Sequence, residues 1–343
     1  MIGNPLLEVE DLTIQYETGS GMVTAVSNAS FTIDRGEYFG LAGESGCGKS
    51  TIAKAIIGGL DPNGQVTSGT ITYDGDQIQD LSQVELNSKI RWREISLIPQ
   101  GSMSSLDPLQ RIRDQAAELA SVHEDLPKKE AVERLSDMFE IVGLPVNRMT
   151  DYPHQFSGGM QQRVLIALAM FLEPSLIIAD EPTTALDVIM QDQIFKYLDR
   201  IKEEANRSMM LITHDISLIL ETCDDMAIMH AGQVAETGSV VDIHDNPRHP
   251  YSILLQRAFP DIRHPERELE DIDGQPPQVV GEVASCTFAD RCPWAVGECR
   301  DSPPGLKQVV ESENHRAACF RKDEVLEMYR NGEIPGVDGG MDS

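Results

Sequence analysis

The sequence lacks several features that mark common functional classes. It has no uninterrupted apolar run of 18 residues or more, which excludes a membrane-spanning helix. Residues 1–5 have neither the basic start nor the long apolar stretch of a signal peptide, so we expect a cytosolic protein. We find no internal repeat and no heptad pattern, which argues against a repeat protein or a coiled coil.

Basic residues are also scarce. Lysine and arginine number 28 against 56 aspartates and glutamates, and the formal net charge is −28. Such a surface repels nucleic-acid phosphates and anionic lipid, which argues against a role in DNA repair or on the ribosome. The composition favours a protein from a high-salt cytoplasm over a moderately acidic bacterial protein. With 343 residues and 41% apolar residues, the chain is long enough for two or three units with a sizeable core.

A complete phosphate-binding loop is present near the N-terminus. Residues 43–50 read GESGCGKS and fit the pattern G-x-x-x-x-G-K-[ST]. A short apolar run at 38–42 predicts a buried strand before the loop, and 50–57 has helical spacing. Backbone N–H groups of the loop and the helix N-terminus attract an anion. Lys49 is expected on the β- and γ-phosphates, and the Ser50 hydroxyl on Mg²⁺. The predicted nucleotide ligands are Gly43, Glu44, Ser45, Gly46, Cys47, Gly48, Lys49, Ser50 and Thr51.

A second buried strand, predicted at 176–179, ends in two acidic residues. Asp180 is placed to hold Mg²⁺, and Glu181 to polarise the attacking water as general base. A third apolar run, 211–213, ends at His214 after a predicted helix over 189–205. Because the carboxyl ends of parallel strands meet at one edge, we expect His214 beside the acidic pair.

A second glycine-rich helix start lies between these two regions. Ser157, Gly158 and Gly159 precede a strong helix former over 160–169, which predicts a second anion site. The loop at 43–50 is already expected to surround the phosphates of the nucleotide that this chain binds, so the second anion site is additional to it. Residues 101–155 have helical periodicity, including a helix over 130–142 that Gly143 closes.

Taken in this order, the motifs resemble those of the ATP-binding cassette (ABC) ATPases, over about residues 6–245. The resemblance implies an α/β P-loop NTPase (RecA-like) core with an antiparallel β subdomain and a helical subdomain at about 101–157. It implies adenine stacking on Tyr16, a Mg²⁺-sensing role for Gln100, a γ-phosphate contact for His214 and a loop linking the two sites at 185–187. The fourth signature residue, Met160, departs from the commoner glutamine.

The same resemblance implies partners. The signature residues Ser157, Gly158, Gly159 and Gln161 would face the ATP held by a second cassette, identical or paralogous. Two separate membrane permease subunits and an extracellular solute-binding protein would complete an importer, with this chain at the cytoplasmic face of the membrane. The helical subdomain would carry the surface that couples ATP closure to the membrane subunits.

Residues 246–343 are rich in proline and resemble the C-terminal extension of oligopeptide and dipeptide importer ATPases. Four cysteines cluster there, and a cytosolic chain keeps thiols reduced, so they suggest a metal. No C-x₂₋₄-C pair of a zinc site is present, and a [4Fe–4S] cluster tolerates more varied spacing. The [4Fe–4S] cluster is favoured; zinc and no metal are the alternatives. The candidate ligands are Cys286, Cys292, Cys299 and Cys319, whereas Cys47 and Cys223, the latter expected on a helix, are taken as structural.

We therefore predict the ATP-hydrolysing subunit of a dipeptide or oligopeptide importer, an ATPase that binds ATP and Mg²⁺. The alternatives are the same role for a different cargo, such as nickel or an oligosaccharide, and a soluble ABC ATPase outside transport.

Overall fold

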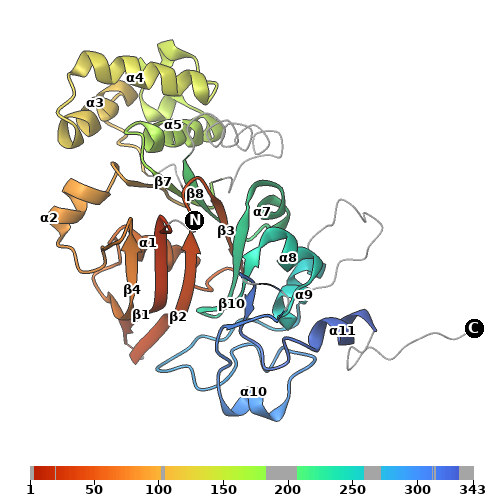
Figure 1. Cartoon of the computed structure of the whole chain (residues 1–343). Helices are drawn as coiled ribbons and strands as arrows, with labels where there is room; N and C mark the ends of the chain where they lie inside the picture. Colours follow the sequence, from red (N-terminus) through yellow and green to blue (C-terminus); the bar gives the residue numbers. More distant parts are fainter. Residues whose placement is uncertain are drawn as a thin grey trace, which may run out of the picture.

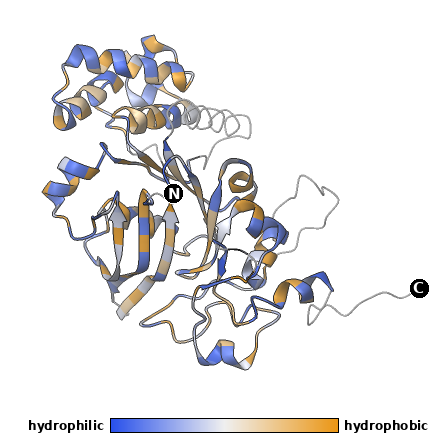
Figure 2. Cartoon of the chain, viewed as in Figure 1, coloured by the Kyte–Doolittle hydropathy of each residue, from blue (hydrophilic) through white to orange (hydrophobic). Residues whose placement is uncertain are grey.

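The computed structural model describes residues 4–19, 21–101, 105–182, 207–258, 272–310, 312 and 314–331. Its strands form two sheets (Figure 1). The smaller sheet is antiparallel in the order β2-β1-β4-β5, as the alternating pattern near the N-terminus predicts. Hydrophobic and hydrophilic residues alternate along its strands in Figure 2, since one face is buried. The strands are β1 (Leu7–Thr18), β2 (Gly21–Ile33), β4 (Gly64–Tyr73) and β5 (Asp76–Gln77).

The larger sheet has the order β11-β12-β10-β9-β3-β8-β7-β6. Its pairs from β9 to β6 are parallel, and the pairs on the other side, from β9 to β11, are antiparallel. The strands are β3 (Tyr38–Gly43), β6 (Ile95–Ile98), β7 (Leu176–Asp180), β8 (Ser208–Thr213), β9 (Asp225–His230), β10 (Gln233–Ser239), β11 (Lys307–Gln308) and β12 (Arg316–Ala317).

Helices cover both faces of this sheet. Figure 1 shows α3, α4 and α5 together at the top of the molecule, and α10 and α11 at the bottom. The α-helices are α1 (Lys49–Ile56), α2 (Gln83–Glu85), α3 (Ile112–His123), α4 (Lys128–Ile141), α5 (Gly158–Met170), α7 (Ile216–Thr222), α8 (Val240–Asp245), α9 (Pro250–Ala258), α10 (Gly297–Asp301) and α11 (Val325–Arg330). The ranges described also contain the helical segments η1 (Leu86–Ile90), η3 (Val146–Thr150) and η4 (Pro153–Gln155). Within the described ranges, no helix is long and apolar enough to cross a bilayer.

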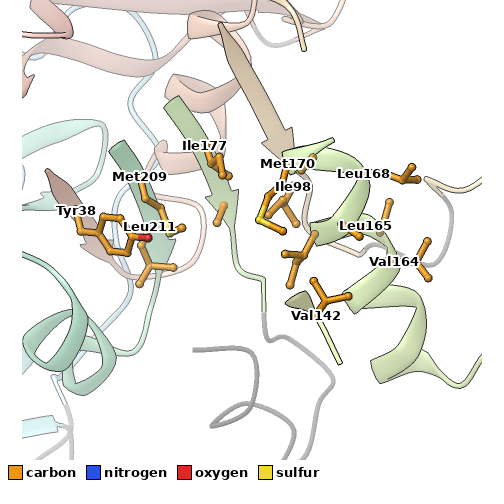
Figure 3. Close-up of a cluster of buried hydrophobic side chains, with 14 of the residues drawn as sticks. Tyr38, Ile98, Val142, Val164, Leu165, Leu168, Met170, Ile177, Met209 and Leu211 are labelled. Atoms are coloured by element: carbon orange, nitrogen blue, oxygen red, sulfur yellow. The ribbon is translucent and has the colours of Figure 1, made fainter. Parts of the chain in front are cut away.

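The central strands divide their side chains between two cores because successive residues of a strand point to opposite faces. On β7, Ile177 and Ala179 pack into one core, and Leu176 and Ile178 into the other. The first core contains α5, whose Met170 lies beside Ile98 of β6 in Figure 3. The second contains α1 and the antiparallel sheet. The helices α1 and α5 therefore lie on opposite faces of the central sheet.

Most predicted elements are confirmed within a few residues. The predicted helix over 130–142 is α4, and Gly143 follows it with a φ of 65°. The expected strand–helix alternation over 176–245 is wrong at β9 and β10, which form an antiparallel hairpin. Its turn has positive φ at Ala231 (44°) and Gly232 (85°), the geometry of a type I′ turn. Cys223 follows α7 as its C-cap and is not within the helix. The predicted helix over 189–205 lies outside the described residues.

Candidate nucleotide and cysteine sites

The predicted phosphate loop connects β3 to the N-terminus of α1. Gly43 and Gly48 have φ of 148° and 107°, which L-residues rarely adopt. A Cβ on Gly48 would lie 2.5 Å from the Ala25 carbonyl oxygen. Lys49 is 5% exposed, and its Nζ donates to the carbonyls of Gly43 (2.7 Å) and Glu44 (2.9 Å). The backbone thus supports the loop shape that the motif predicts, with one buried ammonium group inside it.

Asp180 ends β7 next to this loop and is 6% exposed. Burial raises the pKa of its carboxyl group, while a hydrogen bond from Ser50 and the nearby Lys49 oppose that shift. Its Oδ1 is buried and has no hydrogen-bond partner among the described residues. A buried, unpartnered carboxylate oxygen beside a serine hydroxyl is the oxygen donor set that Mg²⁺ prefers. The residues predicted for Mg²⁺, Ser50 and Asp180, therefore fit the ion.

Glu181 follows Asp180 and joins two other predicted residues. Gln100 Nε2 donates to Glu181 Oε2 at 2.7 Å, and His214 Nδ1 lies 3.2 Å from Oε1. The parallel register of β7 and β8, which pairs Asp180 with Ile212, brings Glu181 and His214 together. Glu181 has a φ of 47°, a left-handed conformation uncommon outside glycine and typical of functional sites. Its side chain is 13% exposed, whereas that of His214 is 58% exposed.

The second glycine-rich segment begins α5 as predicted. Ser157 is the exposed N-cap residue, and its side chain caps no backbone N–H of the helix. Arg148 holds the preceding turn: it pairs with Asp151, donates to the Gln155 carbonyl at 2.7 Å and covers the Phe156 ring. Arg148 Nη1 also lies 3.7 Å from the Met160 sulfur, so the departure at this signature position has a structural partner.

Three predicted nucleotide ligands lie against other parts of this chain, which the motifs do not indicate. Gln161 Nε2 donates to the Pro153 carbonyl at 2.8 Å, which ties its side chain to the turn before α5. Cys47 is buried, and burial raises the pKa of its thiol. Tyr16 on β1 is half-buried and lies against Gly64, where a Cβ would come 2.6 Å from its ring. Residues 185–187, the predicted linking loop, lie outside the described residues.

Glu44 of the phosphate loop contacts residues that sequence reasoning missed. Both oxygens of its carboxylate accept from Arg291, at 2.8 and 2.7 Å. Its backbone N–H donates to the Tyr251 hydroxyl oxygen at 3.1 Å. Arg291 lies 247 positions from Glu44 along the chain, so no local signal could have revealed the pair.

The four clustered cysteines line one small cavity in the C-terminal segment, together with Phe288, Trp294, Pro304 and Phe320. Burial raises the pKa of the Cys292 and Cys319 thiols to about 12, and it also raises the pKa of Cys286. Within the described ranges, no group of three or more histidine, cysteine or acidic side chains is arranged to hold a metal ion. The fold thus brings the four predicted thiols to one apolar site, but not into the close group that a single ion requires.

Two known protein families match separate parts of the chain. Residues 26–184 match the family described as ABC transporter. Residues 235–299 match the oligopeptide/dipeptide transporter C-terminal region. The oligopeptide transport ATP-binding protein OppD of Salmonella typhimurium is 42% identical over 94% of this chain and 96% of its own length. The chain belongs to the ABC transporter family.

Other relatives support this assignment. The dipeptide transport ATP-binding protein DppD of Bacillus subtilis is 39% identical over 94% of this chain and 96% of its own length. A structure described as the dimeric post-hydrolysis state of the ATP-binding cassette MJ0796 bound to ADP and Pi superposes with a TM-score of 0.62 at 29% identity. It covers 68% of this chain and 98% of its own. The fold is therefore that of an ABC ATPase, and the chain is an ATPase of this family.

Proposed function

We propose that this ABC ATPase powers the import of dipeptides or oligopeptides through separate membrane subunits. The names of its relatives, which are oligopeptide and dipeptide transport ATP-binding proteins, support this cargo. So does the match of residues 235–299 to the C-terminal region of such transporters. We also propose residue 246 as the start of an extension to a nucleotide-binding domain over 1–245, and a peripheral position on the cytoplasmic side of the membrane.

Polar groups converge at the carboxyl ends of β6, β7 and β8, beside the phosphate loop, and this arrangement supports the proposed catalytic roles. Lys49 and Ser50 would bind the phosphates and Mg²⁺, and the buried Asp180 Oδ1 would hold Mg²⁺. Glu181 would take a proton from the attacking water. Its carboxylate already accepts from Gln100 and contacts His214, so both would orient it near the γ-phosphate.

We propose that two cassettes close around two ATP molecules. The helices α1 and α5 lie on opposite faces of the central sheet, so each glycine-rich helix start serves a different surface. Ser157 is exposed and caps no backbone N–H of α5, which leaves this helix start available to the γ-phosphate on a partner. A relative of known structure is described as dimeric with ADP and Pi.

The coupling surface would lie beside the helical subdomain. An open pocket of about 440 Å³ is lined by apolar groups, including Trp92, Leu119 and Leu168, and by the acidic Asp107 and Glu118. Leu109 and Val122, near or on α3, are 85% and 69% exposed. An exposed apolar patch with a polar rim is typical of a protein interface, and a segment of a membrane subunit is the proposed occupant.

The test is transport by the assembled complex. The chain would be co-expressed with its two membrane subunits, reconstituted in vesicles and supplied with solute-binding protein and labelled cargo. We expect ATP-dependent uptake of peptides and none of nickel or oligosaccharide. Uptake must disappear with Glu181→Gln and persist with Glu221→Gln, an exposed glutamate on α7. Uptake of nickel or oligosaccharide in place of peptides would overturn the cargo assignment.

We also propose that the four thiols around the C-terminal cavity bind a [4Fe–4S] cluster. Four cysteines on one apolar cavity are the donor set of such a cluster. The alternative, one tetrahedral zinc, needs all four sulfurs about 2.3 Å from a single ion. When bound, the cluster would cross-link loops that have little regular structure. Iron and acid-labile sulfide in protein purified without oxygen would support it, and iron-free protein from such a preparation would contradict it.

A further proposal concerns salt. Beyond the net charge of −28, carboxylates crowd at the amino end of β9, where burial and then Asp224, Asp34 and Asp242 raise the pKa of Asp225. Ions screen such repulsion, so we propose adaptation to a high-salt cytoplasm. The melting temperature should rise from low salt to molar KCl, and an unchanged value would contradict the proposal.

A further inference from the structure

The phosphate loop contains a residue whose charge opposes its function. Glu44 is the second residue of a loop that would bind the phosphates of ATP, and its side chain is 23% exposed. A carboxylate near these phosphates disfavours binding, because like charges repel more strongly where water is partly excluded. The loop therefore needs something that neutralises Glu44 or holds it in place.

Arg291 meets this need from the C-terminal segment. Its Nη1 and Nη2 donate to the two oxygens of Glu44 at 2.8 and 2.7 Å, a bidentate pair. The Arg291 side chain is 7% exposed, so solvent screens this pair less than it screens a surface pair. The carboxylate in turn raises the pKa of the Arg291 guanidinium, which is charged at all working pH values.

Other contacts fix the guanidinium in one orientation. Arg291 Nε donates to the Asp273 carbonyl at 2.9 Å, and Nη1 lies 3.1 Å from His230 Nε2. Burial, together with Arg291, lowers the pKa of His230 to about 3, so the imidazole is neutral and its Nε2 accepts. Its Nδ1 then donates to the Thr287 hydroxyl at 3.1 Å. The arginine is therefore held by groups that do not belong to the phosphate loop.

The backbone of Glu44 is held from the same side. Its N–H donates to the Tyr251 hydroxyl oxygen, and Tyr251 is fully buried at the start of α9. The rings of Tyr251, His230 and Phe288 pack against one another, with centroids 4.8 to 5.3 Å apart. Both the side chain and the backbone of Glu44 are thus fixed by residues that follow the central strands in sequence.

We propose that Arg291 is a positioning residue of the phosphate loop, which neutralises Glu44 and makes ATP affinity depend on the C-terminal segment. The proposal rests on the assignment of residues 43–51 as the phosphate loop. It predicts that the cost of losing Arg291 comes from the charge of Glu44, and that removing this charge restores binding.

The experiment measures the equilibrium affinity of the full-length chain for a fluorescent ATP analogue with Mg²⁺. We expect Arg291→Ala to weaken binding roughly tenfold, because it leaves a partly buried carboxylate unpaired beside the phosphates. The double variant Arg291→Ala, Glu44→Gln should return to within about twofold of Glu44→Gln alone. The loss should shrink in molar KCl, because salt screens the repulsion. Arg300→Ala, an exposed arginine on α10, is the matched control and should bind normally.

The possible results separate this proposal from its alternatives. Wild-type affinity in folded Arg291→Ala overturns it. A double variant as weak as Arg291→Ala also overturns it, because the contact is then only structural. If Arg291→Ala does not fold, Arg291→Lys and its combination with Glu44→Gln carry the same test, with about a threefold loss expected because the charge remains but the bidentate geometry is lost. Normal binding by Lys49→Ala would instead overturn the loop assignment itself.

Discussion

The nucleotide site and the cysteine site are built in opposite ways. In the nucleotide site, charged groups stand at the carboxyl ends of neighbouring parallel strands, and the sheet register aligns them. In the cysteine site, thiols from largely irregular chain surround an apolar cavity, and burial raises their pKa. The nucleotide site is defined by strand ends and one glycine loop. The cysteine site depends on the way in which long loops pack over the core. The first is therefore specified by short motifs, and the second by tertiary packing.

The largest expected effect breaks the nucleotide site alone. Glu181→Gln keeps a side chain of the same shape but cannot accept a proton, so ATP hydrolysis should fall by roughly 10²–10⁴ while ATP binding persists. The measurement is steady-state hydrolysis together with equilibrium binding. Glu221→Gln on α7 is the control and should hydrolyse ATP normally. Normal hydrolysis by Glu181→Gln would remove the general base from this site.

A smaller loss is expected at the edge of the same site. His214, directly after β8, contacts Glu181, and its side chain is more exposed than that of Glu181. His214→Ala should lower kcat by roughly tenfold to a hundredfold and change the KM for ATP less, because it removes one orienting contact while the Gln100 hydrogen bond remains. His244→Ala, on α8, is the control. Equal losses in both variants would show that the effect is not specific to the site.

The next prediction breaks the cysteine site and leaves the nucleotide site intact. Cys319→Ser should lose bound iron and lower the melting temperature, with the KM for ATP within about twofold of wild type. Cys319 is chosen because Cys292 adjoins Arg291, which contacts the phosphate loop. Cys223→Ser, outside the cavity, should keep its iron. If both variants retain iron equally, the thiols around the cavity do not hold it.

The smallest effect tests stability away from both sites. Burial raises the pKa of Glu37, just before β3, to about 8. Between about pH 4.5 and 8, this carboxyl group is protonated in the native state and ionised in the unfolded state. The free energy of unfolding therefore falls as pH rises through this window. Glu37→Gln removes this loss, so its melting temperature should exceed that of wild type by a few degrees at pH 8.5 and by less at pH 5. Glu130→Gln, an exposed residue on α4, should show no such pH dependence.

The elements around the nucleotide site could be predicted because their signals are local. The apolar run 38–42, the glycines at 43, 46 and 48 and the helical spacing after them describe one continuous segment, and β3 and α1 follow it. Gly143 likewise marks the end of α4 within the chain itself. The hairpin of β9 and β10 departs from the predicted strand–helix alternation, because a turn at Ala231 and Gly232 joins the two strands with no helix between them.

The amino-acid sequence alone specifies the phosphate loop, the acidic strand end and the second glycine-rich helix start. Each depends on residues within one turn or one strand end, where backbone geometry follows from residue type. The position of His214 beside the acidic strand end is also predicted from the sequence, whereas the hydrogen bond from Gln100 to the Glu181 carboxylate and the reach of Arg291 back to Glu44 are visible only in the folded structure. Those contacts join segments far apart in the chain, and sheet register and burial, which depend on the whole fold, bring them together.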